Sequence, residues 1–162
     1  MFFLQKEEFP ESSLVRKTFV IRQMDLPPSV KLTKRSMLRW FALSFGLISS
    51  GESRSTVLLV LDSLFSLLLS SKQNPSTTDI QHYIKEKFQK KISEKLIRYH
   101  LNRLIESGLL VRKKARYFLN NNPYAEPNSL KESFSYWIKQ PVNNGMTDIE
   151  GVLSSISDSY KK

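Results

Sequence analysis

Residues 93–119 of the chain have the sequence SEKLIRYHLNRLIESGLLVRKKARYFL, which predicts one helix followed by a short β-hairpin. Apolar residues recur at intervals of three and four in its first half, namely Ile97, Leu101, Leu104 and Ile105. This spacing places them on one face of an α-helix. Ser93 is a favourable N-cap and Gly108 a favourable C-terminal stop. Residues 109–112 and 116–119 then predict two short strands joined across a basic tip.

The opposite face of this helix is polar and basic, and it comprises Lys95, Arg98, Tyr99, Asn102, Arg103 and Glu106. Arginine can bind guanine through two hydrogen bonds, and asparagine can bind adenine in the same way, in a major groove wide enough for a helix. Lys95 and Tyr99 suit contacts with phosphate. We expect the N-terminal half of the helix to carry the base contacts. The alternative interpretation is an ordinary solvent-exposed helix face.

Positive charge is concentrated around the helix. The chain has 25 lysines and arginines against 15 acidic residues, which gives a net charge of +10. Residues 76–120 alone hold 11 basic and four acidic residues. Beside the helix, the basic positions that we expect to contact a partner are Lys91, Arg112, Lys113, Lys114 and Arg116. A field of this sign predicts a polyanionic partner, and nucleic acid is the first candidate.

Two further helical patterns come before residue 93. Residues 53–71 are apolar nearly all round, so we expect a helix that is covered on more than one face. The sequence TDIQ at residues 78–81 matches a capping box and predicts a short helix that ends near Gln89. The order of elements over residues 53–120 is therefore helix, short helix, helix and basic hairpin.

This order resembles the winged helix-turn-helix superfamily. The resemblance rests on a Ser-capped recognition helix, a His-Leu-x-x-Leu core at residues 100–104, the closing Gly108 and a charged two-stranded wing. The flanks are similar, more loosely, to small archaeal proteins of this type. One departure lies at the wing tip, where residues 113–115 lack the Gly or Asn that a two-residue turn prefers.

The resemblance implies a mainly α fold with a small β wing. It places the winged helix-turn-helix core at residues 53–120, after an arm with a strand at residues 1–30 and a basic amphipathic helix at residues 31–52. Residues 121–162 would form a C-terminal helical extension. The implied activity is binding of double-stranded DNA.

The flanking segments carry patterns of their own. Residues 14–24 alternate loosely between apolar and polar side chains, which predicts a half-buried strand. Thr33 can cap a following helix. That helix begins amid a second basic cluster, made of Lys31, Lys34, Arg35 and Arg39. Capping boxes at residues 129–132 and 147–150 predict two C-terminal helices. The last helix has an apolar stripe that suits packing on the domain or on a partner helix, made of Ile149, Val152, Leu153, Ile156 and Tyr160.

Several classes of function have no signal in the sequence. The absence of cysteine excludes zinc fingers of the cysteine type, disulfide scaffolds and thiol nucleophiles. Two histidines and five scattered glycines provide no metal site and no phosphate-binding loop, so we expect neither an enzyme nor a cofactor. The apolar run at residues 57–69 is too short to span a bilayer. Without an export signal, we expect a cytoplasmic, nucleoid-associated protein with no membrane partner.

Two hypotheses for function follow. In the first, the chain is a non-enzymatic transcription regulator or chromatin-associated factor that binds double-stranded DNA as a homodimer. The dimer interface would use residues 57–69, the N-terminal strand or the C-terminal stripe. In the second, it is an interaction module that binds RNA or protein within a larger machine such as the ribosome or RNA polymerase.

Overall fold

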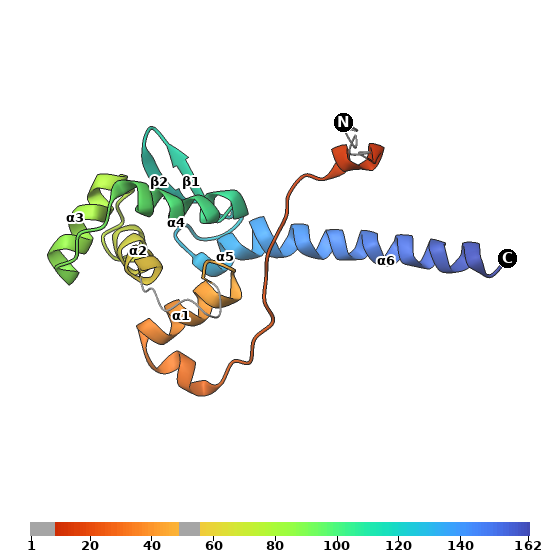
Figure 1. Cartoon of the computed structure of the whole chain (residues 1–162), viewed down its shortest axis with the longest axis horizontal. Helices are drawn as coiled ribbons and strands as arrows, with labels where there is room; N and C mark the ends of the chain where they lie inside the picture. The colour runs from red at the N-terminus through yellow and green to blue at the C-terminus, as the bar shows by residue number, and fades with distance from the viewer. Residues whose placement is uncertain (1–8, 49–55) are drawn as a thin grey trace, which may run out of the picture.

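The computed structural model describes residues 9–48 and 56–162, and it is mainly helical with one small antiparallel sheet of two strands (Figure 1). The main helices are α1 (Lys34–Ser44), α2 (Thr56–Phe65), α3 (Thr77–Phe88), α4 (Glu94–Ser107), α5 (Leu130–Phe134) and α6 (Gln140–Tyr160). The strands are β1 (Leu110–Lys113) and β2 (Arg116–Leu119). Short 3-10 turns form η1 (Pro10–Leu14) and η2 (Pro28–Leu32), and π-helical turns form η3 (Ser66–Ser70) and η4 (Ser135–Lys139).

Helix α2 forms the centre of the core, with α1 on one side of it and α4 and the hairpin on the other in Figure 1. Its most buried side chains are at most 1% exposed, and they are Val57, Val60, Leu61 and Leu64. Helices α1, α3 and α4 all contact α2, so the prediction of a helix covered on several faces is confirmed. Its expected start near Ser53, like the turn at residues 51–54, lies outside the described residues.

Helix α3 begins two residues earlier than the sequence pattern predicts. Ser76 is the N-cap: its hydroxyl accepts from the Asp79 N–H (3.1 Å), and the Ser76 N–H donates to the Asp79 carboxylate (2.9 Å). The capping box predicted at residues 78–81 is therefore wrong. Thr77 is buried against Tyr117, and this tertiary contact places the first turn of α3 ahead of Thr78.

Helix α4 and the hairpin match the predictions to within one residue. The Ser93 hydroxyl accepts from the Leu96 N–H, and Gly108 ends the helix in a left-handed conformation with φ of +92°. Strands β1 and β2 pair from Leu110 with Leu119 to Lys113 with Arg116. Lys114 and Ala115 have φ of +49° and +63°, so they form a two-residue turn with both φ angles positive.

The N-terminal arm, residues 15–27, does not contain the predicted strand. It is extended, but a strand needs a neighbouring backbone edge, and the arm runs along the end of α1 instead. The Arg22 N–H donates to Ser44 O (2.8 Å), and its guanidinium donates to Leu43 O (2.8 Å) and Ile48 O (2.7 Å). One backbone bond and two side chain-to-backbone bonds of Arg22 thus replace the expected ladder.

One continuous helical segment replaces the two helices predicted at the C-terminus. Ser129 caps α5 as predicted, and α5 passes through η4 directly into α6. Thr147 lies within α6, where its hydroxyl donates to Asn143 O (3.1 Å), so it is not an N-cap. Ile138 of η4 is fully buried in the core, whereas α6 projects away from it (Figure 1). Within the described ranges, no helix is long and apolar enough to cross a membrane.

Candidate nucleic-acid interface

Helix α4 divides its side chains as the sequence predicts. Ile97, Leu101 and Leu104 are at most 1% exposed and face the core. On the other side, the side chains predicted to contact nucleic acid are exposed, and they are Lys95, Arg98, Tyr99, Asn102 and Arg103. The helix therefore presents a polar, basic face to solvent.

A chain of contacts joins the N-terminal half of α4 to the start of α3. Glu94 accepts a hydrogen bond from the Thr78 hydroxyl (2.9 Å), and its second carboxylate oxygen lies 3.5 Å from an Arg98 guanidinium nitrogen. The ion pair is solvent-exposed and holds the arginine only weakly. Arg98 thus lies on the side of α4 that faces α3 and keeps its guanidinium accessible.

The hairpin is fixed against the same end of α3. Arg116 donates to Asn74 O (2.9 Å) and lies 3.7 Å from the Asp79 carboxylate. The Tyr117 ring is buried, its hydroxyl shares a hydrogen bond with Thr77, and its N–H donates to Pro75 O. The α3 N-terminus is therefore flanked by α4 and by β2, and Arg116 helps to hold this arrangement together.

The remaining cations of the hairpin point into solvent. The Arg112 guanidinium lies over the Tyr117 ring, 5.5 Å from its centre, and stays exposed. Lys113 and Lys114 are exposed, and their side chains make no hydrogen bond or ion pair within residues 9–48 and 56–162. The same is true of Lys91, Lys95 and Asn102. These five side chains therefore form no polar interaction with the described residues that would stabilise the fold.

Arg103 is engaged in the fold, which the sequence pattern did not reveal. Its guanidinium donates to Gly46 O, contacts the Tyr99 hydroxyl (3.4 Å) and lies over the Tyr99 ring. Residues 18–20 of the arm and Arg103 line the same cavity of about 410 Å³. The arm thus borders the C-terminal half of α4, and among the described residues Lys95 and Arg98 of the N-terminal half stay exposed.

Close packing around Gly108 also places the arm at this end of α4. A Cβ atom there would lie 2.6 Å from Lys17 Nζ. Burial lowers the pKa of Lys17 from its ordinary value, because desolvation disfavours the charged ammonium. The left-handed φ of +92° is what favours glycine at this position, because the flexible Lys17 side chain could move to admit a Cβ atom.

Acidic Asp79 and the two histidines have structural contacts. The hydrogen bond from the Ser76 N–H holds the pKa of the Asp79 carboxyl below its usual value. His100 is half-buried and shares a hydrogen bond with Thr56 (3.2 Å), and His82 pairs with Glu86 on the exposed side of α3 (2.9 Å). In the described part of the chain, no group of three His, Asp or Glu side chains is arranged to hold a metal ion.

An apolar cavity of about 400 Å³ lies between the arm, α1, α2 and α5. Trp40, Phe41 and Phe45 line it and are half-buried, and the Phe41 and Phe45 rings are stacked with centres 5.2 Å apart. The Trp40 indole N–H donates to Asp25 O in the arm (2.8 Å). These aromatic residues pack the arm, α1, α2 and α5 together.

The face made by Lys91, Lys95, Arg98, Asn102, Arg112, Lys113 and Lys114 is hereafter the α4–hairpin surface. Comparisons of the chain with protein-family models, with curated proteins and with solved structures found no match.

Proposed function

We propose that the chain is a non-enzymatic winged-helix protein that binds double-stranded DNA through the α4–hairpin surface. The observation that carries this proposal is a set of exposed basic and amide side chains on one face of α4 and on the adjacent hairpin, most of which make no hydrogen bond or ion pair with the described residues. Surface cations without an internal partner are available for phosphate, and their binding releases counterions from DNA.

In this proposal, the exposed face of α4 enters the major groove. Arg98 and Asn102 carry the base contacts, since both side chains can make paired hydrogen bonds to a base edge. Lys91 and Lys95 contact phosphate. The β1–β2 hairpin acts as the wing, and Lys113 and Lys114 lie against the backbone or the adjacent minor groove. A transcription regulator or chromatin-associated factor would use such a surface.

Fluorescence anisotropy with duplex DNA and with structured RNA, titrated with salt, tests this assignment. We expect wild type to favour the duplex, with a steep dependence of affinity on salt. The double variant Arg98→Ala with Lys114→Asn should bind at least about tenfold more weakly. Its slope against salt should fall by about 0.9 for each phosphate that the variant no longer neutralises. Asparagine is chosen at position 114 because it tolerates the positive φ of the turn.

The matched control removes the same charge from another part of the surface. Lys139→Ala with Lys162→Ala takes two exposed lysines from the C-terminal segment, outside the α4–hairpin surface. Its duplex affinity and salt slope should stay close to those of wild type. Equal losses in both double variants would mean that net charge alone drives binding, and the assignment to α4 would fail.

Binding of structured RNA within a larger machine is the second candidate function. A separate observation favours it: the basic cluster around the start of α1 is exposed, and α1 lies on the other side of α2 from α4 (Figure 1). A folded RNA can reach two separated basic surfaces by shape and phosphate contacts. A preference for structured RNA that Lys34→Ala with Arg35→Ala abolishes would favour this candidate over the first.

A further inference from the structure

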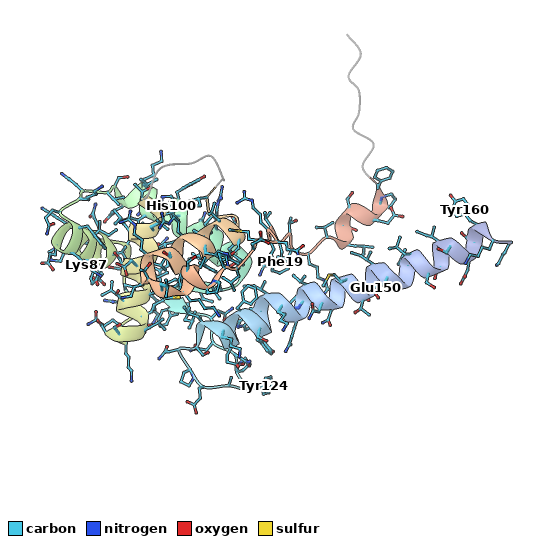
Figure 2. The ribbon with its side chains drawn as sticks, turned by 90° about the horizontal axis from the view of Figure 1, so that it is seen from below. Phe19, Lys87, His100, Tyr124, Glu150 and Tyr160 are labelled. Carbon is cyan, nitrogen blue, oxygen red and sulfur yellow. The ribbon has the colours of Figure 1, made fainter. Side chains whose placement is uncertain are left out.

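Helix α6 carries a row of large apolar side chains that no described residue covers. The side chains are Met146, Ile149, Val152, Leu153, Ile156 and Tyr160, each between 45% and 86% exposed. None of the 21 residues of α6 is buried, and Figure 2 shows the helix extending away from the rest of the chain as far as the labelled Tyr160. A row of this size on one helix indicates a contact that the described residues do not make.

The spacing of the row is that of a coiled coil. From the half-buried Val142 onward, apolar residues alternate at steps of four and three: Val142, Met146, Ile149, Leu153, Ile156 and Tyr160. This is an uninterrupted heptad pattern over the whole free length of α6, with Val152 broadening the seam.

The composition of α6 also requires a partner. Gly145 and Gly151 lie within it, together with two asparagines and four serines, all of which are weak helix formers. An isolated helix of this length and composition is marginal in water. Burial of the apolar seam is therefore the interaction that can hold α6 in its helical form.

Charge on α6 favours another copy of the same helix over an anionic partner. Between residues 140 and 160 there are three acidic residues and no lysine or arginine, and the acidic residues are Asp148, Glu150 and Asp158. At 100° per residue, all three lie about 90° or more from the centre of the seam. Two copies can thus meet without burying a carboxylate, whereas binding to nucleic acid or to an anionic membrane surface would need basic residues there.

The other surfaces expected to form a dimer are used within the chain. The apolar residues of α2 lie in the core, and the arm forms no strand that could pair with a second chain. We propose that the exposed seam of α6, from Met146 to Tyr160, pairs with α6 of a second copy to form a two-helix coiled coil. This inference goes beyond nucleic-acid binding and does not depend on it.

The test compares two double variants of the full-length chain with the same change in charge. Leu153→Glu with Ile156→Glu places carboxylates in the seam. Ser154→Glu with Ser155→Glu places them on the opposite face of the same helix. Sedimentation equilibrium should give wild type and the serine variant a mass of twice 18.8 kDa at high concentration. The seam variant should associate at least about a hundredfold more weakly, because two apolar positions of the seam become charged in each copy.

Far-UV circular dichroism separates dissociation from general unfolding. The helical signal of wild type should decrease on dilution through the concentrations at which the dimer dissociates, because α6 then loses its partner helix. The seam variant should have the lower signal at concentrations where wild type is dimeric, yet melt cooperatively because its α1–α4 core is intact. If the seam variant does not melt cooperatively, its core is unfolded, and the milder variant Leu153→Ser replaces it in the test. We expect Leu153→Ser to weaken the dimer as well.

Energy transfer provides an independent measurement. The chain contains no cysteine, so Ser155→Cys introduces one labelling site on the face away from the seam. Mixing donor-labelled and acceptor-labelled protein should produce transfer, and adding the seam substitutions should remove it. A monomeric wild type, or a seam variant that dimerises as wild type does, would overturn the proposal. Binding of the seam to a different protein by a monomeric chain would overturn it as well.

Discussion

Asp79 links the start of one helix to the position of a strand. Its carboxylate accepts from the Ser76 N–H at the start of α3 and lies near Arg116 of β2. We expect Asp79→Ala to lower the free energy of unfolding by about 0.3 to 1 kcal/mol at neutral pH, the typical value for an exposed carboxylate in the first turn of a helix. Because the pKa of Asp79 is lowered in the folded state, its contribution is present above about pH 4 and is lost as pH falls through the lowered value.

Urea unfolding of wild type and Asp79→Ala from pH 7 down to the acid limit of the fold measures this contribution. The two stabilities should converge as the pH falls. A constant difference over the whole range would mean that the carboxylate charge has no part in the cap. Asp79→Asn provides the control, since it keeps the shape of the side chain and removes the charge.

The tip of the hairpin stores backbone strain at Ala115. An L-residue in the left-handed region is disfavoured by about 1 to 2 kcal/mol, and glycine is not. We expect Ala115→Gly to raise the melting temperature, and Ala115→Val to lower it because a β-branched side chain is least tolerated at a φ of +63°. Neither change alters charge, so duplex affinity should stay constant in both variants if the turn serves only to present its lysines.

At the scale of the element, α4 has two halves with different tasks. Arg103, bonded to Gly46 O, supports the fold, whereas Lys95 is exposed without a partner among the described residues. We expect Arg103→Ala to lower the free energy of unfolding by about 1 kcal/mol, discounted for its exposure, and to leave the salt slope of duplex binding unchanged. Lys95→Ala should leave the free energy of unfolding unchanged and make the salt slope of duplex binding shallower. Unfolding and anisotropy measurements on both variants decide between these outcomes.

The accuracy of sequence-based prediction also differs between elements. Helix α4 and the hairpin were predictable because their signals are local: a serine cap, an apolar face, a closing glycine and two short strands. The arm was mispredicted because alternation alone does not supply a neighbouring strand, and the bonds of Arg22 to the end of α1 come from 21 or more residues away. The break predicted at Thr147 was wrong because a capping sequence inside a helix can bond to its own preceding turn.

For the whole molecule, the two proposals combine into a symmetric DNA-binding dimer. Two-fold symmetric proteins bind two half-sites, and centres of such half-sites lie about 10 base pairs or a multiple of that apart. We expect a duplex long enough for two half-sites to bind wild type much more tightly than a short duplex does. The seam variant Leu153→Glu with Ile156→Glu should bind the long duplex no more tightly than the short one. Its affinity for the short duplex should equal that of a single wild-type domain.

Because Arg22 bonds to the end of α1, proteolytic cleavage beside it would change the structure at that end of the helix. Helix α1 has no basic residue in its last turn, so the guanidinium of Arg22 supplies the positive charge that its terminal carbonyls favour. The same segment, residues 43–48, includes Gly46, whose carbonyl holds Arg103. Cleavage after Arg22 and release of the arm would loosen that segment and free Arg103 from its carbonyl. The arm therefore immobilises Arg103, which is already exposed, and a shortened chain would carry the same charge on α4 in a less fixed position.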